Sequence, residues 1–140
     1  DVLGSRGLGD VYKRQILYYQ HSESRCDIED YLKELSEEDK AEALAKLDTL
    51  AEKGRDIRPT KVFHEAGEDI ILNKGQKNEI KCKMYGLKQN RHRLYAILIE
   101  AKKQIIFTHG KLKKTQPTDK SDKKRFKEIV KRLNDEGELS

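Results

Sequence analysis

Two apolar runs of strand length, separated by a short charged segment, constrain the fold most. Residues 94–99 and 104–108 are rich in Leu, Ile, Phe and Tyr, and the four residues 100–103 between them suit the loop of an antiparallel hairpin. Successive side chains of a strand point to opposite faces of its sheet. We therefore expect Arg93 to lie on the face of the odd-numbered residues, on a surface that the hairpin shares with His109.

A basic cluster follows the second run. Residues 91–132 contain 14 Lys and Arg against 4 Asp and Glu, whereas residues 1–90 contain 16 against 18. A basic surface on one side of a domain favours a polyanionic partner such as RNA or DNA, although solubility alone explains part of such a bias. We expect Lys111, Lys113 and Lys114 to belong to this surface.

Length and cysteine usage limit the class of protein. The 140 residues suffice for one domain with its own core, and the periodic apolar residues argue against disorder despite a charged fraction of 39%. Cys26 and Cys82 lack metal-ligand spacing, which predicts a reducing, cytoplasmic compartment. The histidines are not spaced as ligands either, so we expect no metal site. No apolar run reaches membrane-spanning length.

The segments around the hairpin predict an α+β domain, in which a helical hairpin and a C-terminal helix pack on a small antiparallel sheet. Ser24 and Ser36 are predicted to cap the two helices of the helical hairpin, and Gly54 to end the second. Apolar and polar residues alternate through residues 79–85, which predicts the strand that precedes the β-hairpin. The predicted elements are strands at 16–20 and 79–85, a link at 88–92, and helices after residues 24 and 36 and at 121–133. Residues 64–78, which contain a strand-like run at 70–72, are left mostly unassigned.

The two ends are predicted to lie outside the domain. Residues 5–15, SRGLGDVYKRQ, resemble a translated sequencing adaptor residue for residue. We therefore expect residues 1–15 to be a non-native tail without packed contacts. The single domain then spans residues 16–134, and the acidic residues 135–140 are expected to fray.

Three short motifs occur in the sheet-forming part of the chain: EIK at 79–81, HRLYAI at 92–97 and HGKLKKT at 109–115. They resemble motifs of RelE/HigB-type toxins of type II toxin-antitoxin systems, in the phage-derived HigB-like subfamily. Members of that family typically carry an E-[LI]-[RK] strand, an Arg in a pattern like YRVLYF, and an HGF-x-KKT-x-K-T-P ending. The resemblance covers about residues 16–133.

The resemblance implies an endoribonuclease that cleaves mRNA without a metal or other cofactor, by attack of a 2′-oxygen on the neighbouring phosphate. It also implies a cognate helix-turn-helix antitoxin as partner, and leaves open whether cleavage requires the ribosome. Such chemistry needs an acid, a base and cations around the phosphate. The positions that match the family motifs make Arg93, His109, Lys113 and Lys81 the catalytic candidates.

Further cations near these motifs are RNA-binding candidates. Lys81 stands where the family usually has Arg, and a lysine cannot form the two-pronged contact of a guanidinium; an alternative alignment places Lys88 there. Two other functions remain open: a basic module that binds RNA or DNA without cutting it, and a degenerate toxin that only binds its antitoxin. The RNA-binding candidates are Lys111, Lys114, Arg91 and Lys88.

Overall fold

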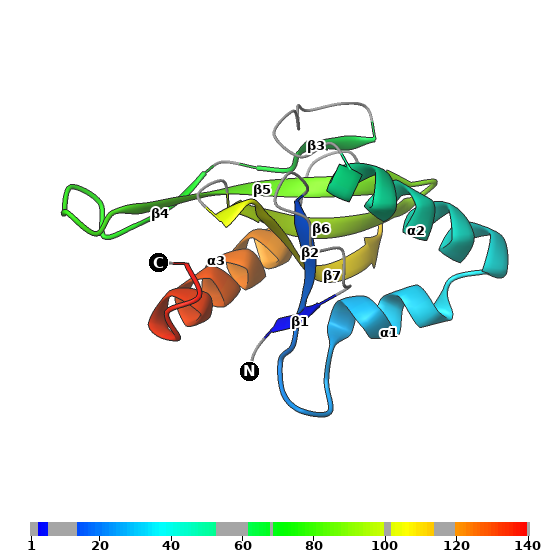
Figure 1. Ribbon diagram of the computed structural model, residues 1–140, viewed down its shortest axis with the longest axis horizontal. Coiled ribbons are helices and arrows are strands. Elements are labelled where there is room, and N and C mark those ends of the chain that lie inside the picture. The colour runs from blue at the N-terminus through cyan, green and yellow to red at the C-terminus, as the bar shows by residue number, and fades with distance from the viewer. Residues whose placement is uncertain are drawn as a thin grey trace.

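Three helices and a mixed β-sheet make up the described part of the chain, which comprises residues 3–5, 14–52, 62–67, 69–99, 102–113 and 120–139 of the computed structural model (Figure 1). The fold is therefore α+β. In chain order the elements are β1 (Leu3–Ser5), β2 (Gln15–Tyr19), α1 (Asp27–Glu34), α2 (Glu37–Glu52), β3 (Phe63–Glu65), β4 (Ile70–Leu72), β5 (Ile80–Gln89), β6 (His92–Ile99), β7 (Gln104–Leu112) and α3 (Lys120–Asp135).

The strand order is β1-β2-β7-β6-β5-β3, and β4 pairs with β5 outside this path. The expectation of an antiparallel sheet is wrong in one respect, because β2 runs parallel to β7. The other pairs are antiparallel. Strands of either kind share the same two-residue periodicity, so the sequence pattern could not tell one direction from the other.

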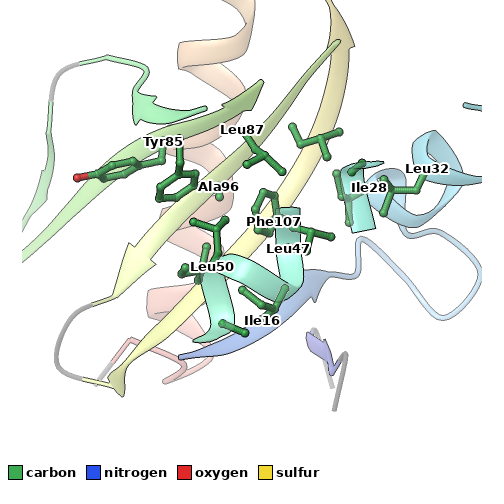
Figure 2. Packing of buried hydrophobic residues seen from close by; sticks show 14 of the residues in the cluster. Ile16, Ile28, Leu32, Leu47, Leu50, Tyr85, Leu87, Ala96 and Phe107 are labelled. Carbon is green, nitrogen blue, oxygen red and sulfur yellow. The ribbon is translucent and has the colours of Figure 1, made fainter. Parts of the chain in front are cut away.

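The central strand β6 is buried on both faces and divides the core in two. Its even-numbered side chains face α1 and α2, where Phe107 packs with Ile16 and Leu47 (Figure 2). Its odd-numbered side chains join a second cluster with Phe126 of α3. The alternation predicted for this strand is confirmed. The even set is Leu94, Ala96 and Leu98, and the odd set is Tyr95, Ile97 and Ile99.

One of the two predicted helix caps is present. The Ser36 Oγ accepts a hydrogen bond from the backbone N–H of Asp39 at 3.1 Å, as expected for the start of α2. The Ser24 prediction is wrong: Cys26 occupies the N-cap position of α1 and makes no side-chain capping bond. The chain is still turning at Ser22 and Arg25, which form an isolated bridge, so the helix begins later. Gly54 lies outside the described residues.

The strand before the β-hairpin is longer than predicted. β5 continues to Gln89 and β6 begins at His92, so the expected link at 88–92 is reduced to a tight turn at residues 90–91. Asn90 in this turn has a φ of 54°. Gln89 is fully buried, and its side-chain amide donates to Asp39 at 2.8 Å and to Glu42 at 2.7 Å. These bonds to α2 satisfy a polar group that a buried strand end would otherwise leave unpaired.

Both ends of the chain make more contacts than expected. Leu3–Ser5 pairs with β2, and the backbone N–H of Arg14 donates to the carbonyl of Ala51 at 3.0 Å. At the other end Leu139 is 7% exposed and belongs to the α3 core. The predictions of a contact-free tail and of fraying after 134 are therefore wrong for these residues, because each covers an edge or an apolar surface. The adaptor origin of 5–15 stays a prediction.

Gly110 of the third family motif faces α1 across a very short gap. A Cβ built on this residue would lie 2.4 Å from the ring of Tyr31. Tyr31 is itself fixed, since its hydroxyl lies 2.6 Å from Nδ1 of His92. The glycine is thus required by packing between α1 and β7.

We expect Gly110→Ala to lower the free energy of unfolding by about 1–3 kcal/mol, the usual cost of overpacking. Gly67→Ala is the matched control, because its Cβ would lie 3.4 Å from Met84 Sδ, an ordinary contact. Urea unfolding measures both. Adding Gly110→Ala to a Tyr31→Ala background should cost much less, and an equal cost in both backgrounds would contradict the packing explanation.

Candidate functional site

A β-bulge at Thr108 decides which side chains of β7 reach the face that α3 covers. Tyr95 of β6 pairs with His109, but the next residue of β6 pairs with Phe107, so Thr108 has no partner in the ladder. Strict alternation would put Phe107 and His109 on one face. The extra residue changes the phase, and His109 and Lys111 lie instead on the face of Arg93.

Cations from adjacent strands form a row on this face. Lys88 of β5 is directly opposite Arg93 of β6, which is directly opposite Lys111 of β7. Neighbouring strands are about 5 Å apart, and like charges placed opposite one another destabilise a sheet. Lys113 and His64 lie near this row, since His64 experiences the charges of Lys88, Arg93 and Lys113. We call these five residues the basic face.

Sequence reasoning missed His64. It lies in β3 opposite Gly86 of β5, on the same face as Lys88 two residues further along. Burial and, after it, the charges of Arg93, Lys113 and Lys88 lower the pKa of His64 from its usual 6.5. The imidazole is therefore neutral near pH 7 and can accept a proton. Only the pairing of β3 with β5 reveals its place, and the short segment around it carries no periodic signal.

Arg93 is held in place by the tight turn that precedes it. Its Nη1 donates to the carbonyl of Asn90 at 2.9 Å and to that of His92 at 3.0 Å. Its Nε is buried and has no hydrogen-bond partner among the described residues. A guanidinium anchored in this way keeps its planar fork oriented, which suits it to a phosphate.

His109 is not exposed at the surface. It is 2% exposed, with Nδ1 2.8 Å from the Thr108 Oγ1 and Nε2 3.2 Å from an oxygen of Asp122. The Thr108 hydroxyl also lies 3.3 Å from the carbonyl of Tyr95, so its one hydrogen can go either to that carbonyl or to Nδ1 of His109. Since a carboxylate only accepts, Nε2 of His109 donates to Asp122.

Asp122 is a second residue that sequence reasoning missed. It lies in the first turn of α3 and is 6% exposed, and its other oxygen accepts from Lys111 Nζ at 3.0 Å. One carboxylate thus joins two side chains of β7, those of His109 and Lys111, to the positive end of a helix. The sequence signal is weak: an acid in the first turn of a basic helix. His109 and Asp122 therefore link α3 and Lys111 to the sheet.

Lys81 does not share the site. It lies seven residues before Lys88 on β5, on the opposite face, and so about 20 Å away. It is directly opposite Ile71 in the β4–β5 hairpin, which extends on the side away from α1 and α2 (Figure 1), and pairs with Asp69 at 3.3 Å. The expectation that Lys81 joins Arg93 is wrong. Lys81 lies on the other face of the sheet and near the opposite end of β5.

The remaining candidates lie near the basic face or outside the described residues. Arg91 is exposed in the β5–β6 turn, and its carbonyl accepts from the backbone N–H of Lys113 at 2.8 Å. Lys113 thereby stays beside the turn that holds Arg93. Lys114 lies outside the described residues.

Comparisons with known protein families, with curated proteins and with solved structures found no match. The described residues contain no group of His, Cys, Asp and Glu that could hold a metal ion. No helix in the same part of the chain is long and apolar enough to cross a membrane. Cys26 and Cys82 are both free and buried, and burial raises the pKa of Cys82 to about 11.

Removing Asp122 tests the buried pair. We expect Asp122→Ala to lower the free energy of unfolding by about 1–3 kcal/mol, since it removes the acceptor of the buried His109 Nε2 and the carboxylate that pairs with Lys111. Asp135→Ala, which removes an exposed acid from the same helix, should change it by less than about 0.5 kcal/mol. Denaturant unfolding measures both. Equal effects of the two substitutions would show that the pair does not hold α3.

Proposed function

We propose that this protein is a metal-independent endoribonuclease and that the basic face binds the RNA phosphate. The observation that supports this most is the row formed by Lys88, Arg93 and Lys111. Lys88 and Arg93 are like charges directly opposite each other, Asp122 offsets the charge of Lys111, and a bound phosphodiester would remove the remaining repulsion. The motif resemblance to RelE/HigB-type toxins supports the same reaction, with mRNA as substrate and a helix-turn-helix antitoxin as partner.

The reaction needs no atom beyond RNA and protein. The 2′-oxygen attacks the adjacent phosphorus and loses its proton to a base, while negative charge grows on the phosphorane oxygens. The bond from phosphorus to the 5′-oxygen then breaks, and an acid protonates the departing oxygen. The products are a 2′,3′-cyclic phosphate and a 5′-hydroxyl, so protons and electrons balance.

We assign these roles to residues of the basic face. Arg93 donates to the phosphorane oxygens, since its guanidinium is already fixed by the turn. His64 accepts the 2′ proton, because its lowered pKa keeps it neutral. Lys113, close enough to affect the pKa of His64, protonates the leaving oxygen. His109 serves through Asp122 and Lys111, whose positions it fixes.

The second candidate is a basic surface that binds RNA, DNA or an antitoxin without cleaving anything. Two observations favour it: His109 is buried with both nitrogens bonded, and Lys81 is far from Arg93. Two of the four residues that the family resemblance makes catalytic therefore do not belong to the basic face. The basic face itself would be the same, so only activity separates the two candidates.

We expect Arg93→Ala to reduce RNA cleavage in EDTA by about two to three orders of magnitude, the usual effect of losing one transition-state donor. RNA affinity should fall much less, and the slope of log affinity against log salt should flatten by about one. Lys81→Ala is the matched control, since it removes a cation from the opposite face and should change neither. Cleavage is measured with and without ribosomes.

The outcomes separate the candidates clearly. If Arg93→Ala and the wild type cleave equally, Arg93 is not part of the mechanism. If the wild type binds RNA but cleaves none under any condition, the binding module is correct. In that case affinity loss should be shared about evenly among Lys88→Ala, Arg93→Ala and Lys113→Ala.

The pH dependence tests His64. A base must be deprotonated to act, so the rate should fall only as the pH drops below the lowered pKa, that is, below the usual 6.5. His64→Gln should reduce the rate and abolish this acidic limb, while His21→Gln should leave the limb unchanged. An acidic limb that persists in His64→Gln would remove His64 as the base.

A further inference from the structure

A second cationic region lies on the β2 side of α3, apart from the basic face. A cavity of about 580 Å³ separates α3 from the end of β2 and the turn that follows it. Of the described residues that line this cavity, four are cations and one, Glu128, is an acid. None of them belongs to the basic face. The cations are Arg25, Lys124, Arg125 and Arg132, and we call the cavity the arginine groove.

Asp27 holds part of the arginine groove in place from one side. Its two oxygens accept from Arg25 Nε at 2.8 Å and from Arg25 Nη2 at 3.0 Å, and it also pairs with Arg125. The His21 Nε2 lies 3.2 Å from the same carboxylate. Arg25 and His21 of the turn and Arg125 of α3 thus all contact one acid, Asp27. Asp27 itself does not line the groove.

Arg132 is fixed from the other side. Its Nη1 donates to the Tyr19 hydroxyl at 3.0 Å and to the His21 carbonyl at 2.9 Å, and its Nε donates to Glu136 at 3.3 Å. The side chain of Arg132 remains 43% exposed, and that of Arg25 is 61% exposed. A guanidinium has five N–H donors, so these bonds leave donors of both arginines available to a ligand.

The surroundings of His21 show that positive charge is in excess here. Burial and, after it, the nearby cations lower the pKa of His21 from its usual 6.5 to about 4. Burial and the charge of Arg25 also lower the pKa of Arg125. Asp27 alone does not offset the cations. The charged or titratable groups around His21 are Arg25 and Asp27 after β2, Tyr19 of β2, His109 of β7, and Arg125 and Arg132 of α3.

We propose that the arginine groove is an anion-binding site that takes a phosphate group, supplied either by a small phosphate compound or by the backbone of RNA. Guanidinium forks match the oxygens of a phosphate, and two of them converge here with Lys124. The cavity is larger than one phosphate, so it also has room for the group that carries it. The binding does not depend on cleavage at the basic face.

The arginine groove and the basic face lie close enough together for one RNA strand to supply the phosphate to the groove. His21 in the groove experiences the charge of His109, and Asp122 joins His109 to Lys111 of the basic face. A strand of RNA that crosses the first turn of α3 would contact both regions. Small phosphate compounds would occupy the groove alone.

The test is an NMR titration with inorganic phosphate and, separately, with a short single-stranded RNA. We expect phosphate to raise the pKa of His21 from about 4, since a bound anion offsets the neighbouring cations. The double variant Arg25→Gln/Lys124→Gln should weaken phosphate binding about tenfold or more, the scale of one lost charge-assisted hydrogen bond. Lys127→Gln, an exposed cation of α3 outside the groove, should not.

The single variant Lys124→Gln is the control for misfolding of the double variant, because it leaves both hydrogen bonds between Arg25 and Asp27 intact. RNA affinity that falls in the groove variants but not in Lys127→Gln supports the backbone source, and a loss for inorganic phosphate only supports a small compound. No phosphate binding, or equal binding in the groove variants and in Lys127→Gln, overturns the proposal. Arg93→Ala should bind phosphate normally, so failure of the proposed cleavage leaves this test unaffected.

Discussion

The bulge at Thr108 is the constraint on which the site depends. By inserting one unpaired residue it turns His109 and Lys111 toward α3, and the Thr108 hydroxyl satisfies the Tyr95 carbonyl beside it. Asp122 of α3 then contacts both side chains. Without the bulge these side chains would face α1, where Phe107 and its neighbours form an apolar core. The contact of β7 with Asp122 of α3 and the place of Lys111 in the row of cations follow from this one irregularity.

The first turns of α3 separate two cationic regions that differ in construction. On the basic face, like charges are directly opposite one another on a rigid sheet, and Asp122 offsets only the Lys111 end. In the arginine groove the cations come from a turn and a helix, and Asp27 holds them from behind. Both regions contain a histidine whose pKa is lowered, His64 in one and His21 in the other. In each case burial is the larger cause of the lowered pKa, and nearby cations are the smaller one.

Local patterns predicted the elements well wherever burial imposed a period. The alternation of β6, the hairpin to β7 and the C-terminal helix are confirmed, because each has one or two faces packed in a core. The errors fall where local pattern carries no information. The parallel pairing of β2 with β7, the contacts of Leu3–Ser5 and the burial of Leu139 all depend on segments far apart in the chain.

The sequence by itself determined the α+β class, the face that Arg93 occupies and the concentration of positive charge in the second half of the chain. Each of these follows from composition or from a two-residue period. Only the tertiary structure decided that His64 joins Arg93, that Lys81 does not, and that His109 is buried against Asp122. The physical reason is that strand pairing and the phase change at a bulge depend on partners distant in sequence, and a local period is the same with or without them.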